Sequence, residues 1–360
     1  MREATVELLR ELTEANGVPG FEGNIARIVE RELGSFTSIS RDHLGSIICE
    51  KDGGAGGPKI MLAGHMDEIG FMVNIVTKEG FVKFSPLGGW WDQVLLGQRV
   101  VIETRKGPIT GIIGSKPPHL LKPDERDKVQ KRSDMFIDVG ARDKRQATNT
   151  FGILPGDPII PLSEFGRMAN KQLLMGKAWD DRVGVGLFVE TLNRLKRRKH
   201  PNVLFGVGTA QEEVGLRGAQ TSVQTIGPDL GIVLETGIAG DVPGISEEES
   251  SVKLGGGVTI YLLEGSMIPD ARFRDFAIDV CKRDKIPYQV SILERGGTDG
   301  GKMHLHARGV PCLIVGVPTR HIHSHTGIIH ARDFDNAVKL LLALVKRLDA
   351  KTVEKLLSPP

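Results

Sequence analysis

Two amphipathic helices are predicted at the start of the chain. Val6, Leu9 and Leu12 recur at helical spacing on one face, and Gly17 with Pro19 marks the end of that helix. The next segment repeats the same spacing, so we expect a second helix directly after the first. Its buried stripe is predicted to consist of Ile25, Ile28, Val29 and Leu33.

Strand patterns come next. Residues 37–41 and 46–50 have the pattern of a hairpin that turns at residues 42–45. A Gly-rich turn then leads into an apolar strand at residues 59–62, which runs toward His65. The first part of the chain is therefore expected to contribute a hairpin and one buried strand to a sheet.

The pattern changes at about Gly70. Helical periodicity is lost for roughly ninety residues, and short strands separated by turns rich in Gly, Pro and Asp replace it. This pattern is typical of a small barrel or sandwich, with the charged residues 116–132 as a surface loop. The strands are expected at residues 71–76, 81–84, 99–104, 109–113, 136–139 and 158–161.

Helices and strands alternate again after Ser163. A helix is expected at residues 181–198, followed by buried strands at residues 203–207 and 231–234. The remaining elements are predicted at residues 271–285 (helix), 289–293 and 312–317 (strands) and 334–357 (one long C-terminal helix).

These elements predict an α/β fold class, an open sheet with helices on both faces. Residues 1–69 and 165–360 would form this catalytic domain, and residues 70–164 an inserted all-β, barrel-like domain. A chain of 360 residues is long enough to bury two cores.

Composition excludes several classes of partner. The net charge is only +2 and the charges are interspersed, so we expect neither nucleic acid nor a membrane surface as a partner. Cys49, Cys281 and Cys312 lie far apart, which argues against a disulfide framework or a cysteine zinc site. No apolar stretch approaches ~18 residues and the N-terminus is charged, so a cytoplasmic location is expected.

Polar residues gather where the predicted strands end or helices begin. Two histidines and three carboxylates, one of them shared, are what a pair of divalent metals about 3.5–4 Å apart requires. Neighbouring glutamates can also divide the work, one holding a metal and the other moving a proton. The candidates are His65 with Asp67, Asp180 with Asp181, Glu212 with Glu213, Glu235, and the cluster His321, His323 and His325.

Each candidate also has an ordinary structural interpretation. His65 alone could be a hydrogen-bonded core histidine, although the carboxylate of Asp67 could orient its imidazole. Asp181 could be a helix N-cap, and Glu235 a surface residue. His321, His323 and His325 alternate and could lie on one side of an extended segment, where only one is needed as a ligand and the others could line a polar cleft.

The motifs resemble those of the tetrahedral aminopeptidases, whose members are also named glutamyl or deblocking aminopeptidases and cellulase-like (endoglucanase) proteins. The resemblance covers essentially the whole chain, in order and at compatible spacings. The motifs that carry it are Ala63-Gly64-His65-Met66-Asp67-Glu68-Ile69-Gly70, Lys177-Ala178-Trp179-Asp180-Asp181-Arg182, Gln211-Glu212-Glu213-Val214-Gly215, Gly296-Gly297-Thr298-Asp299 and Ile322-His323-Ser324.

The resemblance implies a role for several candidate residues. Asp180 would bridge two divalent metal ions, with zinc expected first and cobalt or manganese as alternatives. His65 and Glu235 would complete one site, and Glu213 and His323 the other. Glu212 would be the catalytic base. From their positions in the chain rather than from the resemblance, Asp67 and Asp181 are candidates for supporting the ligands, and Thr298 and Asp299, on the Gly-rich turn, for positioning substrate.

The resemblance also implies a cis peptide bond between Asp180 and Asp181, dimers formed through the inserted domain, and assembly of dimers into a dodecamer. Two positions depart from the family's pattern. Glu235 stands where relatives usually have Asp, and Ser324-His325-Thr326 replaces the usual Ser-Pro followed by an acid. Both changes lie beside predicted ligands.

The sequence thus predicts a metallo-aminopeptidase that acts on short peptides. A glycoside hydrolase is the main rival of different chemistry, but it would need two separated carboxyls and would leave His65 and His323 without a task. A deacylase or carboxypeptidase with a similar metal pair is a nearer rival. A scaffold that has lost its metals is the non-enzymatic one.

Overall fold

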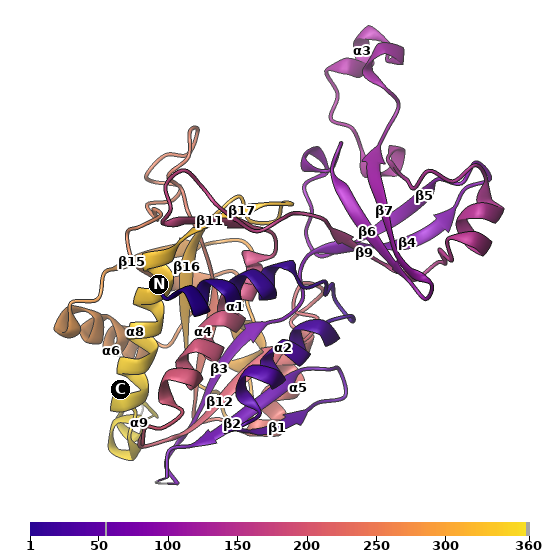
Figure 1. Cartoon of the computed structure of the whole chain (residues 1–360). Coiled ribbons are helices and arrows are strands. Elements are labelled where there is room, and N and C mark those ends of the chain that lie inside the picture. Colours follow the sequence, from indigo (N-terminus) through magenta and orange to yellow (C-terminus); the bar gives the residue numbers. More distant parts are fainter. Residues whose placement is uncertain (55, 358–360) are drawn as a thin grey trace.

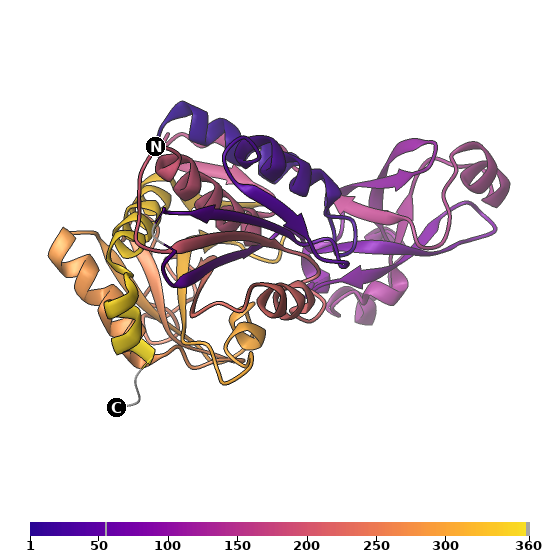
Figure 2. The same ribbon diagram turned by 90° about the horizontal axis from the view of Figure 1, so that it is seen from below.

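The computed structural model describes residues 1–54 and 56–357 and divides the chain into a large α/β part and a smaller β barrel (Figure 1). Strand pairing confirms the predicted α/β class, because an open mixed sheet carries helices on both faces. The view from below shows the barrel projecting from one end of the α/β part (Figure 2).

Four parallel strands form the centre of the open sheet, so their carboxyl ends meet at one edge. These are β12, β3, β13 and β16. The full strand order is β1 (Ser38–Arg41), β2 (Ile47–Asp52), β12 (Val203–Thr209), β3 (Lys59–His65), β13 (Leu230–Ile238), β16 (Cys312–Arg320), β17 (Gly327–His330), β11 (Leu173–Gly176) and β10 (Gly166–Arg167). A branch adds β14 (Val258–Glu264), paired with β16, and β15 (Tyr288–Leu293), paired with β14.

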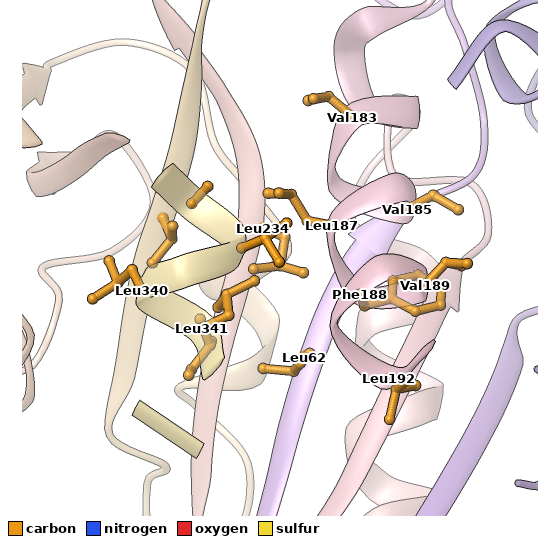
Figure 3. Close-up of a cluster of buried hydrophobic side chains, with 14 of the residues drawn as sticks. Leu62, Val183, Val185, Leu187, Phe188, Val189, Leu192, Leu234, Leu340 and Leu341 are labelled. Carbon is orange, nitrogen blue, oxygen red and sulfur yellow. The ribbon is translucent and has the colours of Figure 1, made fainter. Parts of the chain in front are cut away.

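Alternating side chains of these strands feed two cores. In β3, Leu62 packs in the larger core and its neighbours Met61 and Ala63 in the smaller one on the opposite face. Figure 3 shows the larger core, with Leu62 and Leu234 of the sheet facing α4 and α8. The larger core is covered by α1 (Glu3–Glu14), α2 (Gly23–Leu33), α4 (Trp179–Leu195), α6 (Ala271–Asp284), α8 (Ala331–Arg347) and α9 (Ala350–Leu357), and the smaller one by α5 (Arg217–Ile226) and α7 (Gly300–Met303).

The strands of residues 70–161 close into a barrel around an apolar core of their own. Phe71 is central to this core, stacked on Trp90 with ring centroids 4.8 Å apart. The barrel order is β4 (Gly70–Val76), β5 (Val82–Leu87), β8 (Phe136–Asp138), β7 (Gly107–Gly114), β6 (Arg99–Thr104) and β9 (Pro158–Pro161). The predicted surface loop projects outward and contains the short helix α3 (Pro123–Arg126) (Figure 1).

Three predictions about the elements were wrong or incomplete. The C-terminal segment is two helices, because Asp349 caps the second through the N–H of Thr352, and Asn202 donates to the carbonyls of Val345 and Leu348 at the end of the first. The strand predicted at residues 231–234 continues to Ile238, so Glu235 lies inside it. Helices α5 and α7 and strands β10, β11, β14 and β17 were not predicted.

None of the helices in the described part of the chain combines the length and apolar character needed to cross a membrane.

Candidate metal centre

The predicted site residues converge on one cavity of about 560 Å³ at the carboxyl edge of the parallel strands. Asp67, Asp181 and Asp299 are buried behind its wall, with at most 2% of each residue exposed. The predicted residues that line the cavity are His65, Asp180, Glu212, Glu213, Glu235, Thr298 and His323.

Asp180 lies between two histidines. Its Oδ1 is 3.0 Å from Nε2 of His65, and its Oδ2 is 3.3 Å from Nε2 of His323. Glu213 Oε1 is 3.8 Å from the same nitrogen of His323. One carboxylate therefore presents one oxygen to each half of the site, which is the arrangement that a shared ligand of two cations needs.

Asp181 serves the backbone instead. Its Oδ1 accepts from the N–H of Gly184 at 2.9 Å, as a helix cap does, and its Oδ2 accepts from the N–H of His65 at 3.0 Å. The peptide bond between Asp180 and Asp181 is cis. One oxygen of Glu235 accepts from its neighbour Thr236 at 2.8 Å, which leaves the other oxygen for the cavity.

His65 is oriented through a backbone carbonyl. Its Nδ1 lies 2.9 Å from the carbonyl oxygen of Asp67 and 3.7 Å from that residue's carboxylate. A hydrogen bond at Nδ1 keeps Nε2 directed at Asp180. The Asp67 carboxylate instead accepts from the N–H groups of Glu212 and Glu213, each at 3.0 Å, and so holds the turn that carries both glutamates.

The interpretation in which His321, His323 and His325 share one side of an extended segment is wrong. His321 and His323 have left-handed φ values of +60° and +52°, so the chain turns sharply between β16 and β17. Only His323 of the three lines the large cavity. Its Nδ1 contacts the carbonyl oxygen of Gly89 at 2.5 Å, so a loop of the barrel orients it.

His325 belongs to the packing between the barrel and the α/β part. It is 4% exposed and lies against Trp90, with ring centroids 5.2 Å apart. Burial, helped by Lys177, lowers the pKa of His325 to about 4. Among the described residues neither ring nitrogen has a hydrogen-bond partner.

Burial and crowding dominate the electrostatics of the cavity. Burial raises the pKa of Glu213 to about 8, with a further contribution from Asp180. Burial likewise raises the pKa of Glu212 and of Glu235 well above the usual range. For Asp180, burial is outweighed by hydrogen bonds to His323 and His65, which lower its pKa.

These side chains fit divalent cations. One potential ligand atom from each of His65, Asp180 and Glu213 lies within 4.8 Å of the other two. The same holds for His65, Asp181 and Glu235. Within the described part of the chain, Oε1 of Glu213 is buried without a hydrogen-bond partner. Imidazole nitrogens and carboxylate oxygens suit zinc, cobalt or manganese, and bound cations would offset the repulsion among the acids.

A buried ionic cluster that sequence reasoning missed supports this site. Arg182 donates to the carbonyls of Leu12, Ala15, Gly17 and Met66, and both Arg182 and Lys177 pair with Glu68. Each of the three charged residues is at most 3% exposed. The only local signal is that all three lie inside the motifs around His65 and Asp180.

The Gly-rich turn before α7 forms another wall of the cavity. Thr298 lines it, whereas Asp299 accepts a hydrogen bond from Thr209 at 2.5 Å behind it. Arg295 also lines the cavity and has no ion-pair partner among the described residues. The apolar side chains that line the cavity come from Leu216, Ile238, Tyr261, Leu293 and Ile322.

Comparison with known proteins places the chain in a family. Residues 45–340 match the sequence pattern of the family described as M42 glutamyl aminopeptidase. The chain belongs to this family. The M42 chain is 36% identical to the glutamyl aminopeptidase of Lactococcus lactis subsp. cremoris over 356 residues, which cover 97% of this chain and 98% of the relative.

Solved structures agree with this M42 assignment. The TET aminopeptidase of a marine sediment Thaumarchaeota archaeon is 45% identical, with a TM-score of 0.96 over 98% of this chain and 99% of the other. The TET1 peptidase of Pyrococcus horikoshii, which can assemble into a tetrahedron or a large octahedral shell, is 29% identical, with a TM-score of 0.86 over 96% and 100%. The predicted resemblance and the fold class are confirmed.

Proposed function

We propose that this M42 protein removes N-terminal residues from short peptides by means of two divalent metal ions, with Glu212 as the general base. The observation that carries the proposal is the position of Asp180, whose two oxygens face His65 and His323. The peptidase names of the relatives support the choice of substrate.

The ligand sets of the proposal are those that the family resemblance implies. His65 and Glu235 would complete one site with Asp180, and Glu213 and His323 the other. The chemistry that two divalent ions would supply at these residues is a water of lowered pKa and a polarised peptide carbonyl. Zinc is the first expectation, with cobalt and manganese as alternatives. The side chain of Glu235 is one methylene longer than that of Asp, and this difference would change which metal the site prefers.

The protein's own part in the reaction is to move a proton and to hold the substrate. Glu212 lines the cavity, and its Oε2 lies 3.9 Å from Nε2 of His65. In this proposal it takes a proton from the attacking water and returns it to the leaving amine nitrogen. Thr298 would position substrate from the wall, and Asp299 would support that wall through Thr209.

We also propose that residues 1–69 and 165–360 act as the catalytic unit, and that the barrel at residues 70–164 joins subunits into dimers that build a dodecamer. Closed assembly of a related TET1 peptidase supports this. Large apolar side chains exposed on the barrel do too: Ile75 and Ile112 are each 51% exposed and Trp91 is 62% exposed. Sedimentation of the purified protein as a monomer would contradict it.

Chelation and metal return test the chemistry. We expect hydrolysis of aminoacyl anilides to vanish after exhaustive EDTA treatment and to return with zinc, cobalt or manganese. Activity that survives chelation, or hydrolysis of cellulose at a comparable rate, would support the glycoside hydrolase instead. Cleavage of N-acetylated peptides would favour the deacylase or carboxypeptidase. A metal analysis that finds less than about one ion per chain would favour the scaffold.

Glu212→Gln tests the base. The variant keeps the shape of the side chain but removes its basicity, so turnover should fall by about 10²–10⁴-fold. Metal content, measured by elemental analysis, should stay at the wild-type level, because Glu212 is not a proposed ligand. Near-normal turnover with both metals bound would show that another group is the base.

A further inference from the structure

We infer that Glu22 is a positioning residue for the general base, because its carboxylate anchors the turn that carries Glu212. The role as stated rests on the proposed function of Glu212. The anchoring itself is a property of the fold and can be measured without substrate.

The anchor is a set of hydrogen bonds between distant segments. Oε1 of Glu22 accepts from the N–H of Gln211 at 3.0 Å and from the N–H of Gly20 at 2.8 Å. Asp67 accepts from the next two N–H groups, those of Glu212 and Glu213. Two buried carboxylates therefore hold three successive backbone N–H groups of one turn.

The turn needs anchors from outside. Gln211 has a left-handed φ of +58° and Leu216 one of +57°, conformations that residues other than glycine adopt uncommonly. The N–H groups of Gly215 and Leu216 both donate to the carbonyl of Glu212, but these bonds lie within the turn and do not fix it against the sheet. Glu22 connects the turn to the start of α2. Only 4% of Glu22 is exposed there.

Glu22 and Asp67 use their oxygens differently, and this difference makes the inference testable. Asp67 uses both oxygens, whereas a single oxygen of Glu22 makes both of its bonds. Glutamine has one carbonyl oxygen at the same reach, so Glu22→Gln should keep the anchor without the charge. Glu22→Asp keeps the charge but shortens the reach by one methylene, and Glu22→Ala removes the anchor.

Steady-state kinetics on an aminoacyl anilide at saturating metal separates these roles. We expect Glu22→Ala and Glu22→Asp to lower kcat about 10–100-fold, the cost of a small displacement of a catalytic group, with KM changed less than about threefold. Glu22→Gln should restore kcat to within about threefold of wild type. If Glu22→Ala does not fold, the comparison of Asp with Gln decides.

Asp333→Ala is the matched control for stability. Asp333 is also buried and accepts two backbone N–H bonds, from Gly255 at 2.6 Å and Gly257 at 2.9 Å, but it does not line the cavity. Its loss should lower the melting temperature and leave kcat unchanged. A loss of kcat in this control similar to that of Glu22→Ala would mean that general destabilisation explains both.

Hydrogen exchange of the segment 211–216 gives a second, substrate-free readout. Exchange should be at least about tenfold faster in Glu22→Ala and unchanged in Glu22→Gln, since only the former frees the N–H of Gln211. An inactive wild-type enzyme would refute the proposed function while this anchoring result stood. Wild-type kcat or wild-type exchange in Glu22→Ala, or a Glu22→Gln variant as impaired as Glu22→Ala, would overturn the role of Glu22.

Discussion

Replacing Arg182 with methionine should destabilise the protein more than any exposed Arg→Met change. The guanidinium is fully buried and donates to the carbonyls of Met66 and Leu12 at 2.6 Å, of Ala15 at 2.8 Å and of Gly17 at 3.0 Å. These bonds tie the end of α1 and the segment after His65 to the start of α4. Arg182 therefore joins the two motifs that contain His65 and Asp180.

The magnitude follows from the groups that would be left unpaired. The carbonyl of Gly17 keeps a bond from the N–H of Glu68, and Glu68 keeps Lys177. All four carbonyls lose their bond from Arg182, and among the described residues those of Met66, Leu12 and Ala15 keep no other donor. Each unpaired buried group costs about 1–3 kcal/mol, with the partly buried carbonyl of Ala15 at the low end. Since the variant also avoids burying a charge, we expect a net loss of about 4 kcal/mol. For a chain of this length that lowers Tm by about 5 °C.

Calorimetry of the metal-free protein measures this change, with Arg31→Met as the matched control. Arg31 is 54% exposed and pairs with Glu11 and Glu32 on the surface, where ion pairs contribute less than about 1 kcal/mol. Its Tm should shift by no more than about 1 °C. A Tm of Arg182→Met within 1 °C of wild type would refute the reasoning.

Three further predictions concern the cavity and its supports. Gly89→Ala would place a Cβ 3.2 Å from Nδ1 of His323, so titration with a divalent metal should show at least about tenfold weaker binding. In the control Gly23→Ala the nearest atom to the new Cβ would be 3.8 Å away, and metal binding should be normal. Equal metal affinities of the two variants would contradict the role of the barrel loop. Arg295→Met should lower the kcat/KM ratio of glutamyl over leucyl anilide by about tenfold, because it removes a cation that lines the cavity and could pair with an acidic substrate side chain. An unchanged ratio would mean that Arg295 does not contact the substrate side chain. Burial and Asp67 raise the pKa of Glu22 to about 7, so the contribution of Glu22 to stability is fully present below its pKa in the unfolded state, about 4.3, and is lost as pH rises through about 7. The Tm of metal-free protein, measured from pH 5 to pH 8, should therefore fall more steeply for wild type than for Glu22→Gln. Parallel curves would argue against the raised pKa.

Local patterns of the sequence determined most of the elements. Helices α1 and α2 were predicted because apolar residues recur at helical spacing, and the central strands because buried parallel strands are continuous apolar runs. The barrel was visible as a loss of helical periodicity. The division of the C-terminal helix was missed because its cause includes Asn202, more than a hundred residues away in the chain.

The residues of the candidate site could also be predicted from the local sequence, because acids and histidines lie where strands end and helices begin. Only the tertiary structure decided how they meet: Asp180 between His65 and His323, with Asp181 and Asp67 turned to backbone N–H groups. The bond from Gln211 to Glu22 spans 189 residues, and the contacts of Arg182 with the end of α1 span 165 to 170. Such side-chain to backbone bonds follow no sequence period, because they form only after the sheet has brought distant segments together.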